Sequence, residues 1–106
     1  MIKEINIEKA LDFLRDTSEA HANAKALVKY LEQKRKTVKA IHFIDATGTI
    51  QAREAEAYTA DEYKQLLDDY KTAVYDEQLL INQRKAAELK VEVWRSQNAN
   101  MRRGNI

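Results

Sequence analysis

The residues most able to take part in chemistry are few and widely spaced. The 106-residue chain has two histidines, His21 and His42, together with two glycines and no cysteine. Neither histidine has a second histidine or a carboxylate at the spacing of a metal site, and two glycines cannot build a phosphate-binding loop. The two histidines lie 21 residues apart, which excludes an HExxH motif. We therefore expect a protein that is not an enzyme and that needs no metal and no cofactor.

Three polar side chains occupy positions where helix periodicity would place apolar ones. Glu77 and Arg84 interrupt a heptad seam, and His21 lies on the apolar face of an earlier helix. In an antiparallel hairpin these positions come roughly opposite one another. We expect His21, Glu77 and Arg84 to form a polar layer that fixes register or oligomeric state. A binding pocket built from the same charges is the alternative.

Basic side chains are concentrated in two clusters, one in the motif QKRKTVK and one near the end of the chain. The candidate contacts to nucleic acid or to another partner are Lys34, Arg35, Lys36, Lys39, Arg95, Asn98, Arg102 and Arg103. Basic side chains that follow phosphates give binding that weakens with salt. The pI of 7.9 is nevertheless low for a dedicated nucleic-acid-binding domain, and charged helix ends are commonly just solvated.

The first of the elements that hold these side chains is a long helix. Apolar residues recur at helical spacing after Asn6, a candidate N-cap, and Gly48 is suited to ending the helix in a left-handed conformation. This pattern predicts a helix over about 7–44 and an irregular segment over about 45–58. A β-hairpin formed by AIHFID and TIQ is the alternative for this part of the chain.

The second predicted element is another long helix over about 60–99. Thr59 and Glu62 have the spacing of a capping box, and a seam spaced alternately by three and four residues runs from Tyr63 to Trp94. A polar, basic tail is expected at 100–106. Trp94 is expected to be the packing anchor that holds the end of this helix against the start of the first. The residues after it form either a fraying helix end or a recognition surface.

The two helices predict an all-α protein of one domain, 1–106, folded as a long antiparallel helical hairpin. Residues 25–42 carry six basic and one acidic side chain, whereas residues 43–81 carry three basic and nine acidic ones. Folding back would place these opposite charges together. Apolar residues off the seam exceed what one partner helix can cover. We therefore expect a homo-oligomer, most simply a dimer that forms a four-helix bundle.

No apolar run approaches the length of a membrane span, and the first residues include charges. The expected location is the cytoplasm, without a membrane partner.

The second half of the chain resembles a group of small helical proteins encoded by bacteriophages and prophages. The resemblance covers residues 52–103 and lies in the runs AREAEAY, DEYKQLLDDY and KAAELKVEVWRSQNANMR. Its best-matching positions are Arg53, Glu54, Ala57, Tyr58, Tyr63, Ala86, Ala87, Glu92, Trp94, Arg95, Ser96, Asn98, Ala99 and Arg102. The first half matches only in being helical. The resemblance implies a protein of the bacterial host cytoplasm with a role near DNA replication or recombination, and it implies no catalytic residue.

Three hypotheses for function follow from the sequence. The first is a phage-type accessory protein that binds a macromolecule, such as DNA, in replication or recombination. The second is an anti-defence protein that binds a host protein, or that holds a small nucleotide between subunits in a groove lined by Tyr63, Tyr70, Glu77 and Arg84. The third is a purely structural helical protein whose role is assembly.

Overall fold

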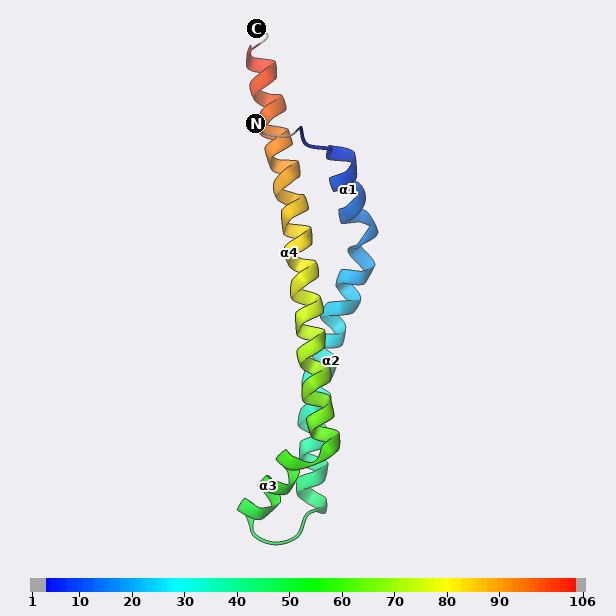
Figure 1. Cartoon of the computed structure of the whole chain (residues 1–106), viewed down its shortest axis with the longest axis vertical. Helices are drawn as coiled ribbons and strands as arrows, with labels where there is room; N and C mark the ends of the chain where they lie inside the picture. Colours follow the sequence, from blue (N-terminus) through cyan, green and yellow to red (C-terminus); the bar gives the residue numbers. More distant parts are fainter. Residues whose placement is uncertain (1–3, 105–106) are drawn as a thin grey trace. The chain divides into compact units, whose positions relative to one another are not determined.

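The structure, a computed structural model, describes residues 4–104. These residues form four helices and no strand (Figure 1). The helices are α1 (Ile7–Asp16), α2 (Ser18–Asp45), α3 (Ile50–Thr59) and α4 (Asp61–Gly104). The predicted all-α class is confirmed. The alternative β-hairpin is wrong, because AIHFID continues α2 and the residues TIQ cap and begin α3.

The chain divides into two compact units, and each is described by itself. Of the described residues, unit 1 comprises 4–22 and 78–104, and unit 2 comprises 23–77. Unit 1 therefore contains α1 and the second part of α4, whereas unit 2 contains most of α2, all of α3 and the beginning of α4.

Unit 2 is built on antiparallel packing of α2 against the beginning of α4. The direction follows from two contacts, since Arg35 stacks on Tyr70 while His42, later in α2, meets Glu62, earlier in α4. The two helices share a core of five buried side chains: Leu31, Val38, Tyr63, Leu66 and Ala73. The last three occupy the seam predicted from the heptad spacing. The antiparallel pairing and the seam are therefore confirmed in this unit.

The segment predicted to be irregular at about 45–58 is mostly helical. Gly48 has a φ of 109°, a conformation that favours glycine, and it turns the chain after α2. The side chain of Thr49 then accepts a hydrogen bond from the backbone N–H of Ala52, so that α3 begins at Ile50. Ala57 of α3 is completely buried. The irregular backbone is thus limited to the few residues between α2 and α3.

The predicted capping box at Thr59 and Glu62 is not formed. The hydroxyl of Thr59 instead donates to the carbonyls of Ala55 and Glu56, within its own helix. Ala60 is extended and separates α3 from α4. Two carboxylates, Asp61 and Glu62, lie in the first turn of α4, where the helix dipole favours negative charge.

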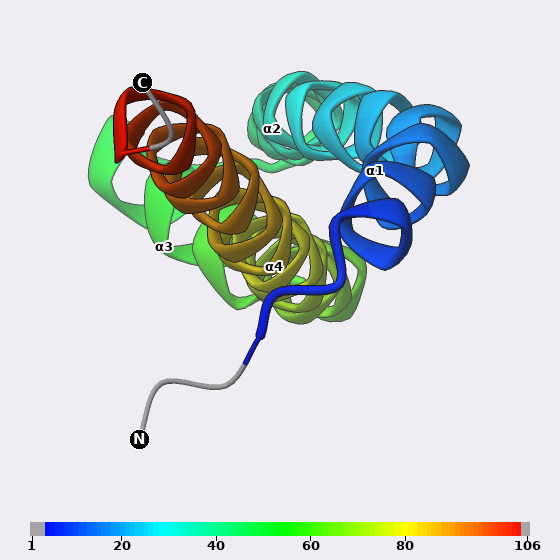
Figure 2. The ribbon, with the colours of Figure 1, turned by 90° about the horizontal axis from the view of Figure 1, so that it is seen from above.

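Unit 1 pairs α1 with the second part of α4 (Figures 1 and 2). The side chain of Asn6 accepts a hydrogen bond from the backbone N–H of Lys9, which confirms the predicted N-cap. Arg84 of α4 reaches the carbonyl of Leu14 and the hydroxyl of Thr17. This contact joins the end of α1 to α4 in an antiparallel arrangement.

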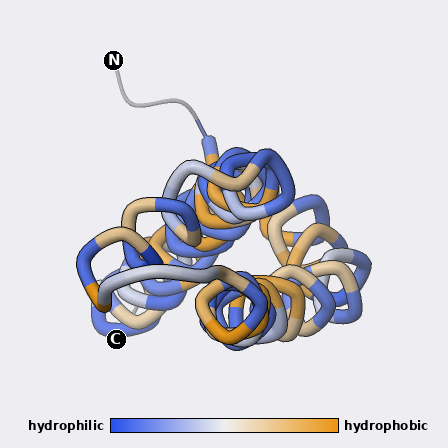
Figure 3. Tube along the Cα trace, turned by 90° about the horizontal axis from the view of Figure 1, so that it is seen from below, coloured by the Kyte–Doolittle hydropathy of each residue, from blue (hydrophilic) through white to orange (hydrophobic). Residues whose placement is uncertain are grey.

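The helix predicted over 7–44 is interrupted, and α4 is longer than predicted. Thr17 separates α1 from α2, with φ −97° and ψ 0°, and its hydroxyl donates to the carbonyl of Phe13. The tail predicted at 100–106 is helical as far as Gly104, and the remaining two residues lie outside the described part. Hydrophobic and hydrophilic positions alternate along the helices (Figure 3). Within residues 4–104, no helix is both long and apolar enough to cross a bilayer.

Candidate macromolecule-binding surfaces

Four lysines share one face of α2 in unit 2. Lys25, Lys29, Lys36 and Lys39 are separated by four, seven and three residues, the intervals that keep side chains on one side of a helix. We call this set the lysine stripe. It extends for about 21 Å along α2 at 1.5 Å per residue. Glu32 lies on the same face and is half-buried, so the stripe carries a net positive charge.

The lysine stripe is not neutralised by carboxylates of the described chain. Among residues 4–104, the ion pair that joins α2 to α4 is His42 with Glu62, at 3.3 Å between Nε2 and Oε2. In the described part of the chain, none of the four lysines comes within ion-pairing distance of a carboxylate. Folding back does place the basic part of α2 beside the acidic beginning of α4, as expected, but among residues 4–104 the opposite charges form no direct Lys/Arg–carboxylate pair between these helices. The positive charge of α2 remains available to an external anion.

Tyrosines take the place of carboxylates as partners of several basic side chains. Lys39 bonds to the hydroxyl of Tyr58, and its Nζ lies 3.9 Å from the centre of that ring. The hydrogen bond to Tyr58 raises the pKa of Lys39 above its usual range. The guanidinium of Arg35 lies 5.0 Å from the ring centre of Tyr70, so Arg35 is partly committed to packing within unit 2.

Lys34 forms a looser version of the same contact. Its Nζ lies 5.7 Å from the ring centre of Tyr30, and both side chains are exposed on α2. Lys36 is exposed as well and borders an open hollow of about 490 Å³ together with Lys39, Phe43 and Glu54. Of the predicted first cluster, Lys34 and Lys36 are thus the freest to contact a partner, while Arg35 and Lys39 are held by tyrosines.

The second predicted cluster lies on the last turns of α4 in unit 1. Arg95, Arg102 and Arg103 are exposed, and Asn98 is half-buried. Arg95 and Arg102 are seven residues apart and therefore share a helix face. The cluster is thus held on a regular helix up to Gly104, which differs from the frayed end that the sequence left open.

Trp94 is not buried by its own chain. The heptad seam predicted that Trp94 anchors the end of α4 against the start of α1. In the structure its exposed fraction is 39%. Heptad drift does not account for this, because Ala87, seven residues earlier on the same seam, is buried. The α4 residues that line the groove beside α1 end at Lys90, one helical turn before Trp94.

The predicted polar layer is only partly assembled. Nη1 of Arg84 lies 2.7 Å from both the carbonyl oxygen of Leu14 and the hydroxyl of Thr17. Arg84 therefore caps the carboxyl end of α1, where a cation is favoured, instead of meeting the predicted region around His21. Oε2 of Glu77 is buried without a hydrogen-bond partner among the described residues. His21 is half-buried, and no hydrogen bond of its ring occurs in the described part.

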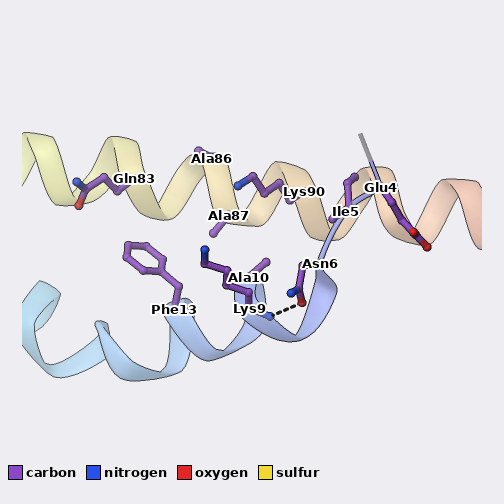
Figure 4. Close-up of a pocket in the computed structure, with 10 residues that line it drawn as sticks. All are labelled: Glu4, Ile5, Asn6, Lys9, Ala10, Phe13, Gln83, Ala86, Ala87 and Lys90. Carbon is purple, nitrogen blue, oxygen red and sulfur yellow. Dashed lines mark hydrogen bonds between the residues drawn. The ribbon is translucent and has the colours of Figure 1, made fainter. Parts of the chain in front are cut away.

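An apolar groove of about 650 Å³ lies between α1 and α4 in unit 1 (Figure 4). Phe13 of α1 points toward α4 and Ala87 points back toward α1, whereas Ala86, also at the border of the groove, lies on the side of α4 away from α1. The small side chain of Ala87 leaves the space that the groove occupies. Lys9 and Lys90 also line it. This groove is not the nucleotide groove predicted around Tyr63 and Tyr70. Those two tyrosines belong to unit 2, where Tyr63 is buried and Tyr70 packs against the core.

Two parts of this surface were missed from the sequence. Lys25 and Lys29 lie outside the dense basic motif, although their spacing from Lys36 was a readable signal. Thr17, which receives the hydrogen bond of Arg84, carried no signal at all. Comparison with protein-family models, with curated proteins and with solved structures found no match for this chain. Function is therefore argued from these surfaces.

Proposed function

We propose that this chain is a non-enzymatic binding protein and that unit 2 binds the phosphate backbone of nucleic acid through the lysine stripe. The observation that carries the proposal is the lack of carboxylate partners for these lysines among residues 4–104. Lys25, Lys29 and Lys36 carry no described ion pair and are available to displace counterions from phosphates, whereas Lys39 is hydrogen-bonded to Tyr58. At a rise of about 3.4 Å per nucleotide, a stripe of about 21 Å matches about six nucleotides of one strand.

The tyrosines near the lysines support the same ligand. Tyr30 is 58% exposed beside Lys34, and Tyr58 is 49% exposed beside Lys39. Exposed aromatic rings next to cations can stack on unpaired bases, which favours single-stranded nucleic acid over duplex. The exposed arginines near the end of α4 are the second proposed contact. A role in replication or recombination, in a phage setting and in the host cytoplasm, remains the hypothesis drawn from the resemblance.

The proposal is tested by fluorescence anisotropy of labelled single-stranded and double-stranded DNA over a salt series. The double variant Lys29→Gln/Lys36→Gln should reduce the slope of log affinity against log salt by about two, since each lysine lost removes about one phosphate contact. The matched control is Lys64→Gln/Lys71→Gln, which removes two exposed lysines from α4 in the same unit. If both pairs have the same effect, the stripe is not the binding surface.

A third variant separates the two basic regions. Arg95→Gln/Arg102→Gln removes two arginines from unit 1 without touching the lysine stripe. A loss of affinity as large as that of Lys29→Gln/Lys36→Gln would make the end of α4 an equal contact. Unchanged affinity would restrict binding to unit 2. If the wild-type chain binds neither DNA at low salt, the nucleic-acid proposal fails as a whole.

A protein partner is the second candidate function, and the groove between α1 and α4 is the feature that favours it. Its lining is mostly apolar, with Ile5, Ala10 and Phe13 on one side and Ala86 and Ala87 on the other. Peptide helices commonly dock into such grooves by their apolar face. An anti-defence protein could bind a helix of a host protein in this groove, and a structural assembly protein could bind a helix of its assembly partner there.

Self-association is the remaining part of the proposal. The sequence predicts a dimer, and a dimer would cover apolar side chains that the single chain leaves exposed, such as Leu89 and Val93. Sedimentation equilibrium of the purified chain over a concentration series tests this part directly. A monomer at every concentration would remove it without affecting the nucleic-acid proposal.

A further inference from the structure

The part of α4 that belongs to unit 1 has two faces with heptad spacing. Arg84, Ala87 and Val91 form the inner face, the side on which Arg84 bonds to α1 and Ala87 is buried. A second set lies on the other side of the helix, with its members spaced alternately by three and four residues. Its members are Leu79, Asn82, Ala86, Leu89, Val93, Ser96 and Asn100. We call this second set the outer face. At 100° per residue it lies about 165° around the helix from the inner face.

The outer face has the pattern of a coiled-coil seam and has no partner within the described chain. Leu79, Leu89 and Val93 are exposed at 44%, 49% and 46%. Three large apolar side chains on one regular stripe differ from the scattered apolar residues of an ordinary surface.

The charges that flank the outer face identify its occupant. In a coiled coil the residues beside the seam contact those of the partner helix, and here the charged ones are Lys85, Lys90 and Glu92. A parallel second copy would place Lys85 of one chain beside Lys90 of the other, a repulsive contact. An antiparallel copy that sets Ala86 opposite Leu89 places Lys85 beside Glu92, and symmetry repeats this attractive contact.

The antiparallel register also fits the sizes of the side chains. It sets the small Ala86 of each copy against the larger Leu89 of the other, on both sides of the two-fold axis. Alternating small and large residues allow two helices to interdigitate. The next layer outward sets Val93 against Asn82. No two like charges face each other in this register.

We propose that the outer face of α4 binds a second copy of this chain in antiparallel orientation, with Lys85 of each copy beside Glu92 of the other. This assigns a face and a direction to the dimer of the proposed function. It is independent of the lysine stripe, which lies on α2. The two copies of α4 become the centre of the dimer, with each α1 on the far side of its own α4.

The first test measures the dimer dissociation constant of full-length variants by sedimentation equilibrium. Lys85→Glu should weaken an antiparallel dimer about tenfold, because it creates two repulsive contacts with Glu92. The exchange Lys85→Glu/Glu92→Lys should restore the wild-type value. In a parallel dimer, Lys85→Glu would instead tighten association, because Lys90 would become an attractive neighbour. Tightening would overturn the proposed orientation.

The control is Glu88→Lys, a charge reversal of the same size and opposite sign on α4 but off the outer face. It should leave the dissociation constant within about twofold of wild type. Lys85, Glu88 and Glu92 are all exposed, and circular dichroism should show unchanged helix content in each variant. A dimer that responds equally to Glu88→Lys and Lys85→Glu would place the interface elsewhere.

A second test uses the absence of cysteine from the chain. In the proposed register Leu79 of one copy lies opposite Ser96 of the other. A mixture of Leu79→Cys and Ser96→Cys chains should therefore form the mixed disulfide under mild oxidation, whereas Ser96→Cys alone should not link to itself. Self-linking of Ser96→Cys would indicate a parallel dimer. If the wild-type chain is monomeric, this inference and the dimer of the proposed function fail together, while DNA binding is measured separately.

Discussion

Units 1 and 2 both pair antiparallel helices, but they fill the contact with different residues. In unit 2, Leu31 and Val38 of α2 pack against Leu66 of α4, so the contact is a true apolar core. In unit 1, alanines Ala10 and Ala87 are the buried residues, and hydrogen bonds from a single arginine join the helices. Small side chains leave a groove where large ones would close the contact.

This difference shows that a regular seam predicts where helices meet but not how tightly. Burial of a leucine stabilises a fold far more than burial of an alanine, because the stabilisation follows the apolar area removed from water. Unit 2 should therefore be the more stable unit, and unit 1 should depend on its polar contact. Each of the following changes tests one side of this comparison.

The largest effect is expected in the core of unit 2. Leu66→Ala should lower the free energy of unfolding by about 2–4 kcal/mol, because it removes a buried side chain and leaves a cavity. The measurement is urea unfolding followed by circular dichroism. The control Leu27→Ala, at an exposed position of α2, should change it by about 0.5 kcal/mol or less. Similar losses in both variants would contradict the assigned core.

The second effect is expected in unit 1. Arg84→Met should lower stability by about 2 kcal/mol, since it removes charged hydrogen bonds to Leu14 and Thr17. Amide hydrogen exchange should accelerate in α1 and stay unchanged in residues 31–38 of α2. Arg15→Met, which removes an arginine with exposed ion pairs near the same helix end, is the control and should have little effect. Uniform acceleration across both units would mean that Arg84 stabilises the chain as a whole.

A smaller effect, of opposite sign, is expected at the polar position of unit 2. Glu77→Leu should raise the free energy of unfolding by about 1 kcal/mol, because Oε2 of Glu77 is buried without a hydrogen bond. Thermal unfolding measures the gain. Asp76→Leu changes the neighbouring, exposed carboxylate and should bring no gain. Destabilisation by Glu77→Leu would show that this carboxylate has a partner in the assembled protein.

The sequence carries enough information to place the helices and the seam. Periodicity correctly identifies Tyr63, Leu66 and Ala73 as buried, because these positions recur on one face of a helix. Periodicity also placed Trp94 in the seam. Trp94 is nevertheless 39% exposed, although Ala87, one heptad earlier, is buried, because periodicity gives the face of a residue but not where along α4 its partner helix begins.

Features that depend on long-range contacts could not be predicted. The interruption of the first helix at Thr17 coincides with a hydrogen bond from Arg84, 67 residues away along the chain. The pairing of Lys39 with Tyr58 likewise joins α2 to α3 across the turn at Gly48. Charge counts by segment suggested carboxylates as the partners of α2. A tyrosine hydroxyl does not enter such a count.

The smallest effect is expected at the pair of Lys39 and Tyr58. Its dependence on pH distinguishes an electrostatic contribution to the stability of unit 2 from a packing contribution. Because Tyr58 raises the pKa of Lys39, the charged amine is favoured in the folded state. The resulting stabilisation is complete below the unfolded pKa of about 10.4 and disappears as the pH rises through the folded pKa. The melting temperature of wild type should therefore exceed that of Tyr58→Phe at pH 7, and the difference should shrink above about pH 10.5. Tyr75→Phe, at an exposed tyrosine, should show no such dependence on pH. A difference that persists at high pH would assign the contact to packing of the ring against the lysine stem.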